Sequence, residues 1–171
     1  MSDRIQELLD QATMVHSNGF VLWDQFAIEA ETALFLFSLV RHQKPELVVE
    51  SGTGQGISST FIGEALAANG KGKLVTFEWY DFFFDGAVQK LKGLPIEVRS
   101  GLSADSGLDP DLVFVDCVSD KRVEEITHWL THPKRPLVII HDARRTEYPF
   151  HLGEGVHLPG HDGVWIGRAK E

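Results

Sequence analysis

Apolar residues near the N-terminus recur at the spacing of a helix. This repeat predicts a helix over residues 4–15 with Asp3 as its cap. Ser17, Asn18 and Gly19 follow it and end the helical pattern. A second helix is predicted from about residue 24 to 42. Its apolar side chains lie on several faces, so it should be well buried, and Pro45 ends it.

Short apolar runs follow and alternate with stretches of helical character. Continuous apolar runs of this length are typical of strands buried on both faces of a sheet. The runs lie at residues 47–49, 74–77, 96–98, 112–115 and 137–140, and helices are expected at about 56–68, 85–92 and 119–131. Such alternation predicts a doubly wound α/β fold with a mostly parallel sheet.

The C-terminal segment has a different pattern. Runs at residues 155–158 and 164–167 flank a linker that contains Pro159, Gly160 and the pair Asp162-Gly163, which predicts an antiparallel hairpin. The hairpin brings the expected sheet to seven strands. A length of 171 residues fits a single domain, residues 1–171, with N-terminal helices over 1–42 and an α/β core over 46–171.

The charge balance narrows the choice of partner. The chain has 16 Lys and Arg against 25 Asp and Glu, a net charge of −9, which argues against a nucleic-acid partner. Basic residues come in pairs in the last third of the chain, and such pairs are expected to be solvated surface. The pairs are Lys121-Arg122, Lys134-Arg135 and Arg144-Arg145.

Cysteine usage and hydropathy indicate the compartment. Cys117 is the one cysteine, so no intrachain disulfide can form, and it is expected to be a small buried residue. The N-terminus does not read as a signal peptide, and no apolar run approaches the 18 or so residues of a membrane span. We therefore expect a cytoplasmic protein with no membrane partner.

The clearest motif is a glycine loop that begins where the first predicted strand ends. Residues 50–58 read Glu-Ser-Gly-Thr-Gly-Gln-Gly-Ile-Ser. A dinucleotide fingerprint needs its third glycine at the position of Ile57, and a P-loop needs a Lys-Ser/Thr pair, so neither pattern fits. Ligands in open α/β sheets bind at this edge, and glycines let the backbone approach them closely.

An acidic residue two positions before a Gly-x-Gly-x-Gly loop resembles motif I of class I S-adenosylmethionine-dependent methyltransferases. The resemblance implies a Rossmann-like methyltransferase fold with S-adenosylmethionine as cofactor. Glu50 would attract the methionine ammonium of the cofactor, directly or through water. Glu78, at the end of the second strand, would accept the ribose hydroxyls. Trp79 would stack on adenine, with core packing as the alternative.

From about residue 30 to 169 the chain is similar to the O-methyltransferases of the catechol and caffeoyl-CoA type. Their Glu-x-Gly-Thr-x-x-Gly-x-Ser loop matches residues 50–58, and their Leu-Pro-x-x-Asp-Gly hairpin matches residues 158–163. The resemblance implies cofactor contacts from the loop, from a Gly-x-Ser at residues 101–103 and from the aspartate after the fourth strand. These residues are Glu50, Gly52, Thr53, Gly54, Gly56, Ser58, Glu78, Trp79, Ser103 and Asp116.

The metal-dependent members of that family hold a divalent cation with an aspartate after the fourth strand and an Asp-Asn pair after the fifth. Asp116 and Asp142 match two of these positions, but Ala143 stands at the third. A site for a divalent metal such as Mg²⁺ with Asp116 and Asp142 therefore stays open as an alternative. The catalytic lysine of the family is Ser119 here, and residues 143–154 leave little room for a crossover helix.

Other polar residues at the same edge are the candidates for catalysis. His141 and Asp142 end the fifth strand and face Asp116, so we expect these three to act on the acceptor, with His141 as a base or as a structural hydrogen-bonding group. Arg144 and Arg145 follow directly and would suit an anionic acceptor.

The sequence thus predicts methyl transfer from S-adenosylmethionine by in-line displacement to a small acceptor that is hydroxylated or anionic, and so a small-molecule partner. The alternative is a non-catalytic S-adenosylmethionine-binding or scaffold protein with a degenerate active site, because the family's lysine and one metal ligand are missing. The first 25 residues would cap the pocket or form a homodimer interface.

Overall fold

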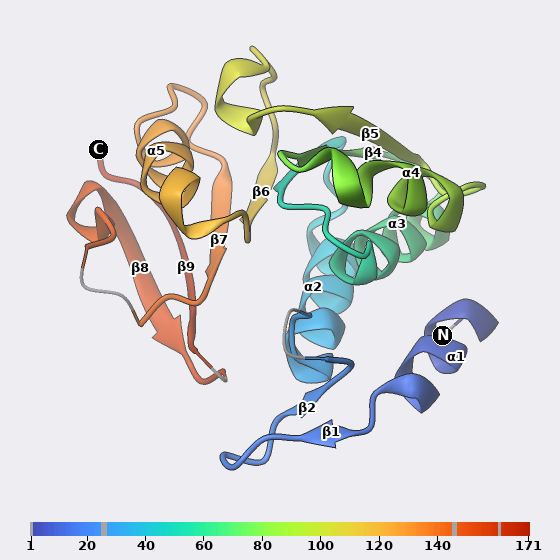
Figure 1. Cartoon of the computed structure of the whole chain (residues 1–171). Coiled ribbons are helices and arrows are strands. Elements are labelled where there is room, and N and C mark those ends of the chain that lie inside the picture. Colours follow the sequence, from blue (N-terminus) through green and yellow to red (C-terminus); the bar gives the residue numbers. More distant parts are fainter. Residues whose placement is uncertain (1, 25–26, 145–146, 161) are drawn as a thin grey trace.

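The central feature of the computed structural model, which describes residues 2–24, 27–144, 147–160 and 162–171, is a twisted sheet (Figure 1). Within these residues seven strands lie in the order β5-β4-β3-β6-β7-β9-β8. Their bounds are β3 (Leu47–Ser51), β4 (Lys73–Glu78), β5 (Ile96–Ser100), β6 (Leu112–Val115), β7 (Leu137–His141), β8 (Gly153–Leu158) and β9 (Val164–Ala169). The strands from β5 to β7 are parallel, and β9 is antiparallel to both β7 and β8. The predicted α/β fold with a terminal hairpin is confirmed.

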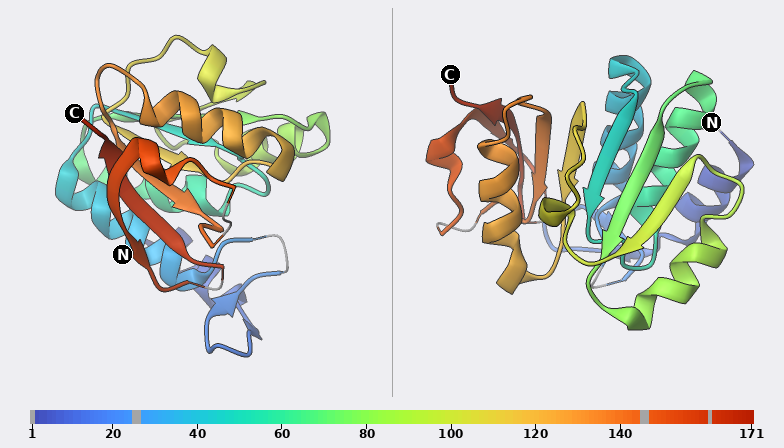
Figure 2. Two further views of the ribbon diagram at one scale, coloured as in Figure 1. Left: turned by 90° about the vertical axis from the view of Figure 1, so that its left-hand side faces the viewer. Right: turned by 90° about the horizontal axis from the view of Figure 1, so that it is seen from above.

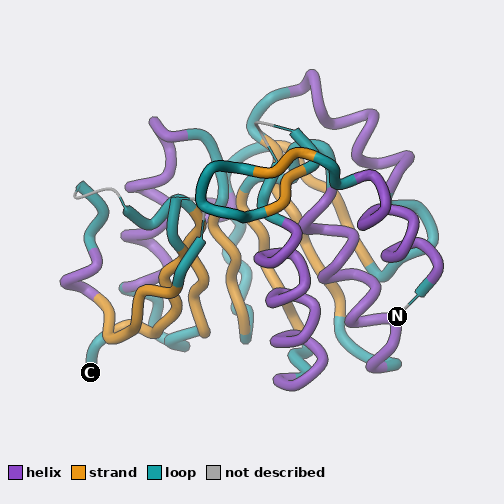
Figure 3. Tube along the Cα trace, turned by 90° about the horizontal axis from the view of Figure 1, so that it is seen from below, coloured by secondary structure: helices purple, strands orange, loops and turns teal. Residues whose placement is uncertain are grey.

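Helices cover both faces of this sheet, as the views in Figure 2 and Figure 3 show. They are α1 (Asp3–Gln11), α2 (Ala30–Gln43), α3 (Ile57–Asn69), α4 (Asp81–Lys90) and α5 (Ser119–Leu130), with short 3-10 turns η1 (Ser103–Asp105) and η2 (Phe150–Leu152). A small hairpin, β1 (Met14–Val15) with β2 (Val21–Leu22), joins α1 to the segment before α2. The helices of the described residues are too short or too polar to cross a bilayer.

Alternate residues of the central strands supply two hydrophobic cores. Val48 and Phe114 point to the face that α1, α2 and α3 cover. Val49 and Val113 point to the opposite face and pack with Ile126 and other residues of α5. Because both faces are buried, most positions of these strands are apolar, which explains the continuous apolar runs.

The N-terminal helices differ from the prediction at their ends. The first ends at Gln11 rather than at residue 15, and its cap is the Ser2 hydroxyl, which accepts from the Ile5 amide at 3.3 Å, rather than Asp3. The second begins at Ala30 rather than at about residue 24, because Glu29 is already extended, with φ −68° and ψ 149°. Extended backbone before α2 carries Glu29 toward the end of β7, as described below.

Two other expectations concern the segments between strands. The helix expected at about residues 85–92 begins earlier, at Asp81, and Phe82 in its first turn is 87% exposed. Between β7 and β8 the described residues form the 3-10 turn η2 and no α-helix, as expected. Since β4 and β6 flank β3 on opposite sides, the chain reverses its strand order beside β3. Ligands bind at such switch points in open α/β sheets.

Candidate active site

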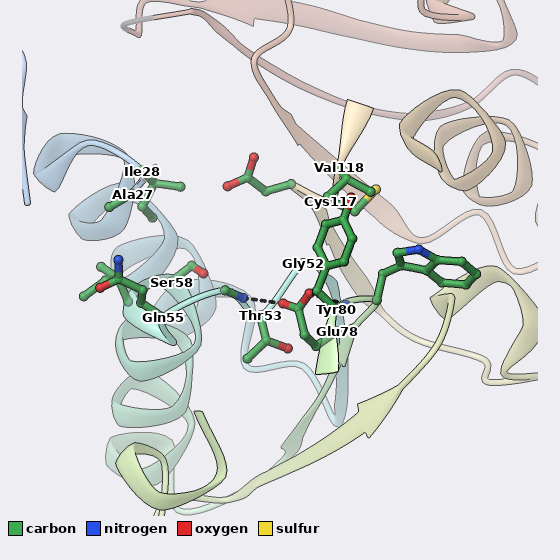
Figure 4. Close-up of a pocket in the computed structure, with 14 residues that line it drawn as sticks. Ala27, Ile28, Gly52, Thr53, Gln55, Ser58, Glu78, Tyr80, Cys117 and Val118 are labelled. Carbon is green, nitrogen blue, oxygen red and sulfur yellow. Dashed lines mark hydrogen bonds between the residues drawn. The ribbon is translucent and has the colours of Figure 1, made fainter. Parts of the chain in front are cut away.

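A cavity of about 380 Å³ opens at this switch point, at the carboxyl ends of β3, β4 and β6. Its size is within the range of small-molecule pockets. Figure 4 shows Ala27 and Ile28 on one side of the cavity and Cys117 and Val118 on the other. The lining residues are Ala27, Ile28, Gly52, Thr53, Gly54, Gln55, Ile57, Ser58, Glu78, Trp79, Tyr80, Asp116, Cys117 and Val118.

The glycine loop forms the floor because its backbone can pass where a side chain would collide. A Cβ atom on Gly52, whose φ is +99°, would lie 2.5 Å from the carbonyl oxygen of Asp116, so only glycine lets the ends of β3 and β6 approach this closely. A Cβ on Gly54 would meet no atom of the described residues within 4 Å. That open side of Gly54 leaves room for a ligand against the loop.

Glu50 lies beneath this loop at the end of β3 and is fully buried. Its Oε2 accepts a hydrogen bond from the Ser59 hydroxyl, but its Oε1 has no hydrogen-bond partner among the described residues. Burial raises the pKa of Glu50 to about 7, although the nearby hydroxyl groups of Ser58, Ser59 and Thr76 oppose that rise. A buried carboxylate oxygen without a partner is costly, and a cationic ligand group would relieve that cost.

Glu78 ends β4 and turns its carboxylate to the cavity (Figure 4). Its Oε2 accepts from the Gly54 amide at 2.7 Å, and its Oε1 accepts from the Tyr80 amide at 2.9 Å. Because each carboxylate oxygen can accept two hydrogen bonds, both can still accept from a ligand. Trp79 is 44% exposed, and the Lys121 ammonium lies 4.9 Å from its ring centroid. Trp79 therefore lies beside the cavity rather than in a core.

The opposite edge of the site is a network of charged groups. The Arg122 guanidinium, from the first turn of α5, donates from Nη2 to Asp116 Oδ1 at 3.1 Å and from Nη1 to Asp142 Oδ2 at 2.8 Å. His141 Nδ1 lies 3.1 Å from Asp116 Oδ1 and 3.3 Å from Asp142 Oδ1. Its Nε2 lies 2.9 Å from Glu29 Oε2. The two cations thus stand among the carboxylates of Glu29, Asp116 and Asp142.

The protonation states follow from these contacts. Burial alone would lower the pKa of His141, but the charge and hydrogen bond of Asp116, together with Glu29, outweigh it and hold that pKa well above its usual value. Burial would likewise raise the pKa of Glu29, but the His141 contact lowers it to about 2. His141 is therefore a cation near neutral pH. A ring that already carries its proton is poorly suited to be the base that the sequence suggests.

A divalent metal does not fit this arrangement as it stands. The ligand atoms of Asp116, His141 and Asp142 lie within 4.8 Å of one another, close enough for a metal cluster. However, Arg122 already pairs with both carboxylates, and a protonated His141 has no lone pair for a metal. The site therefore already holds its own positive charge.

The remaining predicted residues lie in three places. Gly52, Thr53, Gly54, Ser58, Glu78, Trp79 and Asp116 line the cavity together, whereas Glu50 and Gly56, the N-cap residue of α3, do not line it. Ser103 is fully buried; its amide donates to Glu125 at 2.7 Å, and it does not line the cavity. Arg144 is exposed and donates to the Gly160 carbonyl at 3.3 Å in the hairpin turn, and Arg145 lies outside the described residues. The cofactor, substrate and catalytic roles of all these residues stay predictions.

The predicted burial of Cys117 is confirmed, whereas the predicted exposure of Arg122 is wrong. Cys117 is buried as expected, and burial raises the pKa of its thiol to about 11, so it is not a nucleophile at neutral pH. The interpretation of Lys121-Arg122 as solvated surface is wrong for Arg122, which is 5% exposed. The signal was available in the sequence, because Arg122 lies on the same helical face as Ile126 and Trp129. Glu29 carries no comparable signal.

The comparisons with solved structures agree with this fold. A methyltransferase of Podospora anserina, bound to S-adenosylhomocysteine, matches with a TM-score of 0.75 at 16% identity, over 100% of this chain and 89% of that chain. The O-methyltransferase TomG of Streptomyces achromogenes, in complex with S-adenosylmethionine, matches with a TM-score of 0.67 at 23% identity, over 85% of this chain and 82% of its own. A putative caffeoyl-CoA O-methyltransferase of Staphylococcus aureus matches with a TM-score of 0.68 at 14% identity, over 99% and 93%.

No protein-family model and no curated protein sequence matches the chain. At such low identity the structural matches show a shared fold, and that fold is the one that the resemblance implied. The activity has to be argued from the site itself.

Proposed function

We propose that the protein transfers the methyl group of S-adenosylmethionine to a hydroxyl group of a small acceptor. The observation that carries the proposal is the buried Glu50 Oε1, which has no hydrogen-bond partner among the described residues and lies beneath an open glycine loop, close to a cavity that Glu78 lines. The structural relatives bound to S-adenosylmethionine or its demethylated product support the same choice of cofactor.

The residues of the cavity fit the parts of this cofactor in order. The methionine ammonium would give Glu50 the positive partner that it lacks. The open side of Gly54 leaves room for the main body of the ligand, and the Glu78 oxygens can accept from the ribose hydroxyls. Trp79, half-exposed beside Glu78, offers an aromatic face to adenine.

The chemistry divides between cofactor and chain. When bound, S-adenosylmethionine would supply an electrophilic methyl carbon, to which the acceptor oxygen would bond as the carbon–sulfur bond broke and left its electron pair on sulfur. The chain holds the acceptor in line, and positioning of this kind can supply about 7–11 kcal/mol. Asp116 lines the cavity and would accept the hydroxyl proton, while His141 and Arg122 hold its carboxylate in place.

The local charge favours an uncharged acceptor over an anionic one. Glu29, Asp116 and Asp142 carry three negative charges against the positive charges of Arg122 and His141, which leaves the acceptor side at −1. An anion would be repelled there. Arg144, which the sequence predicted to bind an anionic acceptor, instead donates to a carbonyl in the hairpin turn.

Isothermal titration calorimetry of the protein with S-adenosylmethionine and S-adenosylhomocysteine tests the cofactor. We expect micromolar binding of both, weakened at least tenfold at pH 8 by Glu50→Gln and unchanged by Glu97→Gln. Glu97 is a matched control because it is an exposed residue of the edge strand β5, and its carboxylate pairs with Arg99. If the protein binds neither compound at millimolar concentration, the proposal is wrong.

A transfer assay separates an enzyme from a binding protein. The protein, S-adenosylmethionine and one acceptor at a time (catechol, caffeate or benzoate) are incubated, and S-adenosylhomocysteine is measured by mass spectrometry. Turnover with catechol that Asp116→Asn abolishes supports the proposal. Tight cofactor binding with no transfer to any of the three would favour a non-catalytic S-adenosylmethionine-binding protein instead.

A further inference from the structure

Arg122 is an unusual residue to find in the interior of this site. Its side chain is 6% exposed, yet it belongs to the first turn of a helix whose neighbouring residue Lys121 lies over Trp79 beside the cavity. A guanidinium stays charged at any pH that a protein tolerates, and burying it is costly unless each donor finds an acceptor. The burial of this cation therefore needs a structural reason.

The contacts of Arg122 supply that reason. Besides the carboxylates of Asp116 and Asp142, its Nε donates to the Cys117 carbonyl at 2.8 Å, and its Nη1 lies 3.4 Å from the His141 carbonyl. The guanidinium thus joins the carboxyl ends of β6 and β7 through both side chains and backbone. Its planar fork fixes the separation of the two carboxylates, as a flexible point charge would not.

Asp116 and Asp142 are also the residues that sequence resemblance assigns to a divalent cation. Together with His141 they form a cluster whose ligand atoms lie within 4.8 Å of one another. A metal ion there would need carboxylate oxygens that now accept from Arg122, and it would stand beside a fixed positive charge. The same carboxylates can hold the guanidinium or a metal, but not both.

We propose that Arg122 takes the place of a divalent metal in this site: its guanidinium holds Asp116 and Asp142 in position and excludes Mg²⁺ and Mn²⁺ from between them. Removing the guanidinium frees the oxygens of Asp116 and Asp142 that accept from it, and carboxylate oxygens are ligands of the kind that binds divalent cations. The exclusion of metal does not depend on the methyl transfer proposed above, and its test needs neither cofactor nor acceptor.

The test is a titration of the metal-free protein with Mn²⁺, in which free Mn²⁺ is measured by electron paramagnetic resonance. The wild type should bind no ion at a specific site up to about 1 mM, a weak-affinity limit near −4 kcal/mol. Arg122→Ala should bind one Mn²⁺ at least tenfold more tightly than that limit. Adding Asp142→Asn to Arg122→Ala should abolish the binding, and Lys121→Ala, which removes the neighbouring, more exposed cation, should behave as the wild type.

Circular dichroism establishes that each variant is folded. Should Arg122→Ala fail to fold, Arg122→Gln replaces it, because its amide can still donate to the Cys117 or His141 carbonyl. The proposal is overturned if the wild type binds one Mn²⁺ and Asp142→Asn removes it. It is equally overturned if the folded Arg122 variant binds no Mn²⁺.

Discussion

The two halves of the cavity edge satisfy their charges in opposite ways. At the ends of β3 and β4, Glu50 is buried with an unpartnered oxygen and Gly54 faces open space. At the ends of β6 and β7, Asp116 and Asp142 are already paired with Arg122 and His141. The first half is incomplete without a ligand, whereas the second is complete without one.

This difference suggests that one half of the cavity edge binds the ligand and the other half positions the reacting groups. An incomplete half gains free energy when a ligand supplies the missing partner, so it is suited to recognise a cofactor. The β6–β7 half, whose charged groups already pair with one another, gains little from a ligand but holds these groups in fixed positions. Fixed positions suit the alignment of reacting atoms. Substitutions in the two halves should therefore have different effects, chiefly on ligand affinity in the first and chiefly on stability in the second.

The largest effect is expected for Arg122→Met. This change leaves Asp116 and Asp142 without their shared partner, and breaking a buried ion pair in this way costs about 3–5 kcal/mol. Urea denaturation at pH 7, followed by circular dichroism, measures the loss. Lys121→Met, a change of the adjacent and more exposed cation, should cost less than about 1 kcal/mol. A loss below about 1 kcal/mol for Arg122→Met would contradict the pairing described for the β6–β7 half.

The next effect concerns Glu50 and pH. Its pKa is about 7 in the folded chain against 4.5 as its usual value, so the folded state keeps a proton that the unfolded chain releases. The free energy of unfolding should therefore fall as pH rises from about 4.5 to 7, by roughly 3 kcal/mol from this group. Urea denaturation of the ligand-free protein across this range measures the slope.

Glu50→Gln isolates the contribution of Glu50, because a glutamine does not titrate. The difference between the wild-type and Glu50→Gln curves should change between about pH 4.5 and 7 and level off on either side of that range. At pH 6, binding of S-adenosylmethionine should also release the proton of Glu50. The measured binding enthalpy would then depend on the ionisation enthalpy of the buffer. Equal slopes for the two proteins would mean that folding does not raise the pKa of Glu50.

A smaller effect is expected for Glu78→Ala. The variant loses the acceptor for the ribose hydroxyls and the hydrogen bonds to the Gly54 and Tyr80 amides, so the Kd for S-adenosylmethionine should rise about 10- to 100-fold, or about 1.4–2.8 kcal/mol. Calorimetry measures the Kd, and Glu97→Ala is the control. A change of less than twofold would remove Glu78 from the cofactor site.

The smallest effect is expected for Trp79→Leu. Stacking contacts of an aromatic ring contribute about 0.5–1.5 kcal/mol, so the Kd for S-adenosylmethionine should rise about 3- to 10-fold. Stability should change by less than about 0.5 kcal/mol, because Trp79 is 44% exposed. The reverse outcome, lost stability with unchanged affinity, would assign Trp79 to core packing.

The sequence predicted the sheet well because burial on both faces leaves a continuous apolar run, and a glycine loop at a strand end has few alternatives. It placed the start of α2 about six residues too early, since apolar residues around 27–28 continue the helical pattern although they line the cavity instead. It placed Arg122 on the surface because a charged residue type is usually exposed. Both errors arose where tertiary contacts outweigh local preference.

The contact between Glu29 and His141 joins positions 112 residues apart in the chain. Proteins are synthesised from the N-terminus at about 5–20 residues per second, so Glu29 leaves the ribosome roughly 6–22 s before its partner does. During that time the segment that carries Ala27 and Ile28 has no His141 to hold it. The wall of the cavity that these residues form is therefore completed only after β7 has been made, which puts the closing of this site among the last steps of folding on the ribosome.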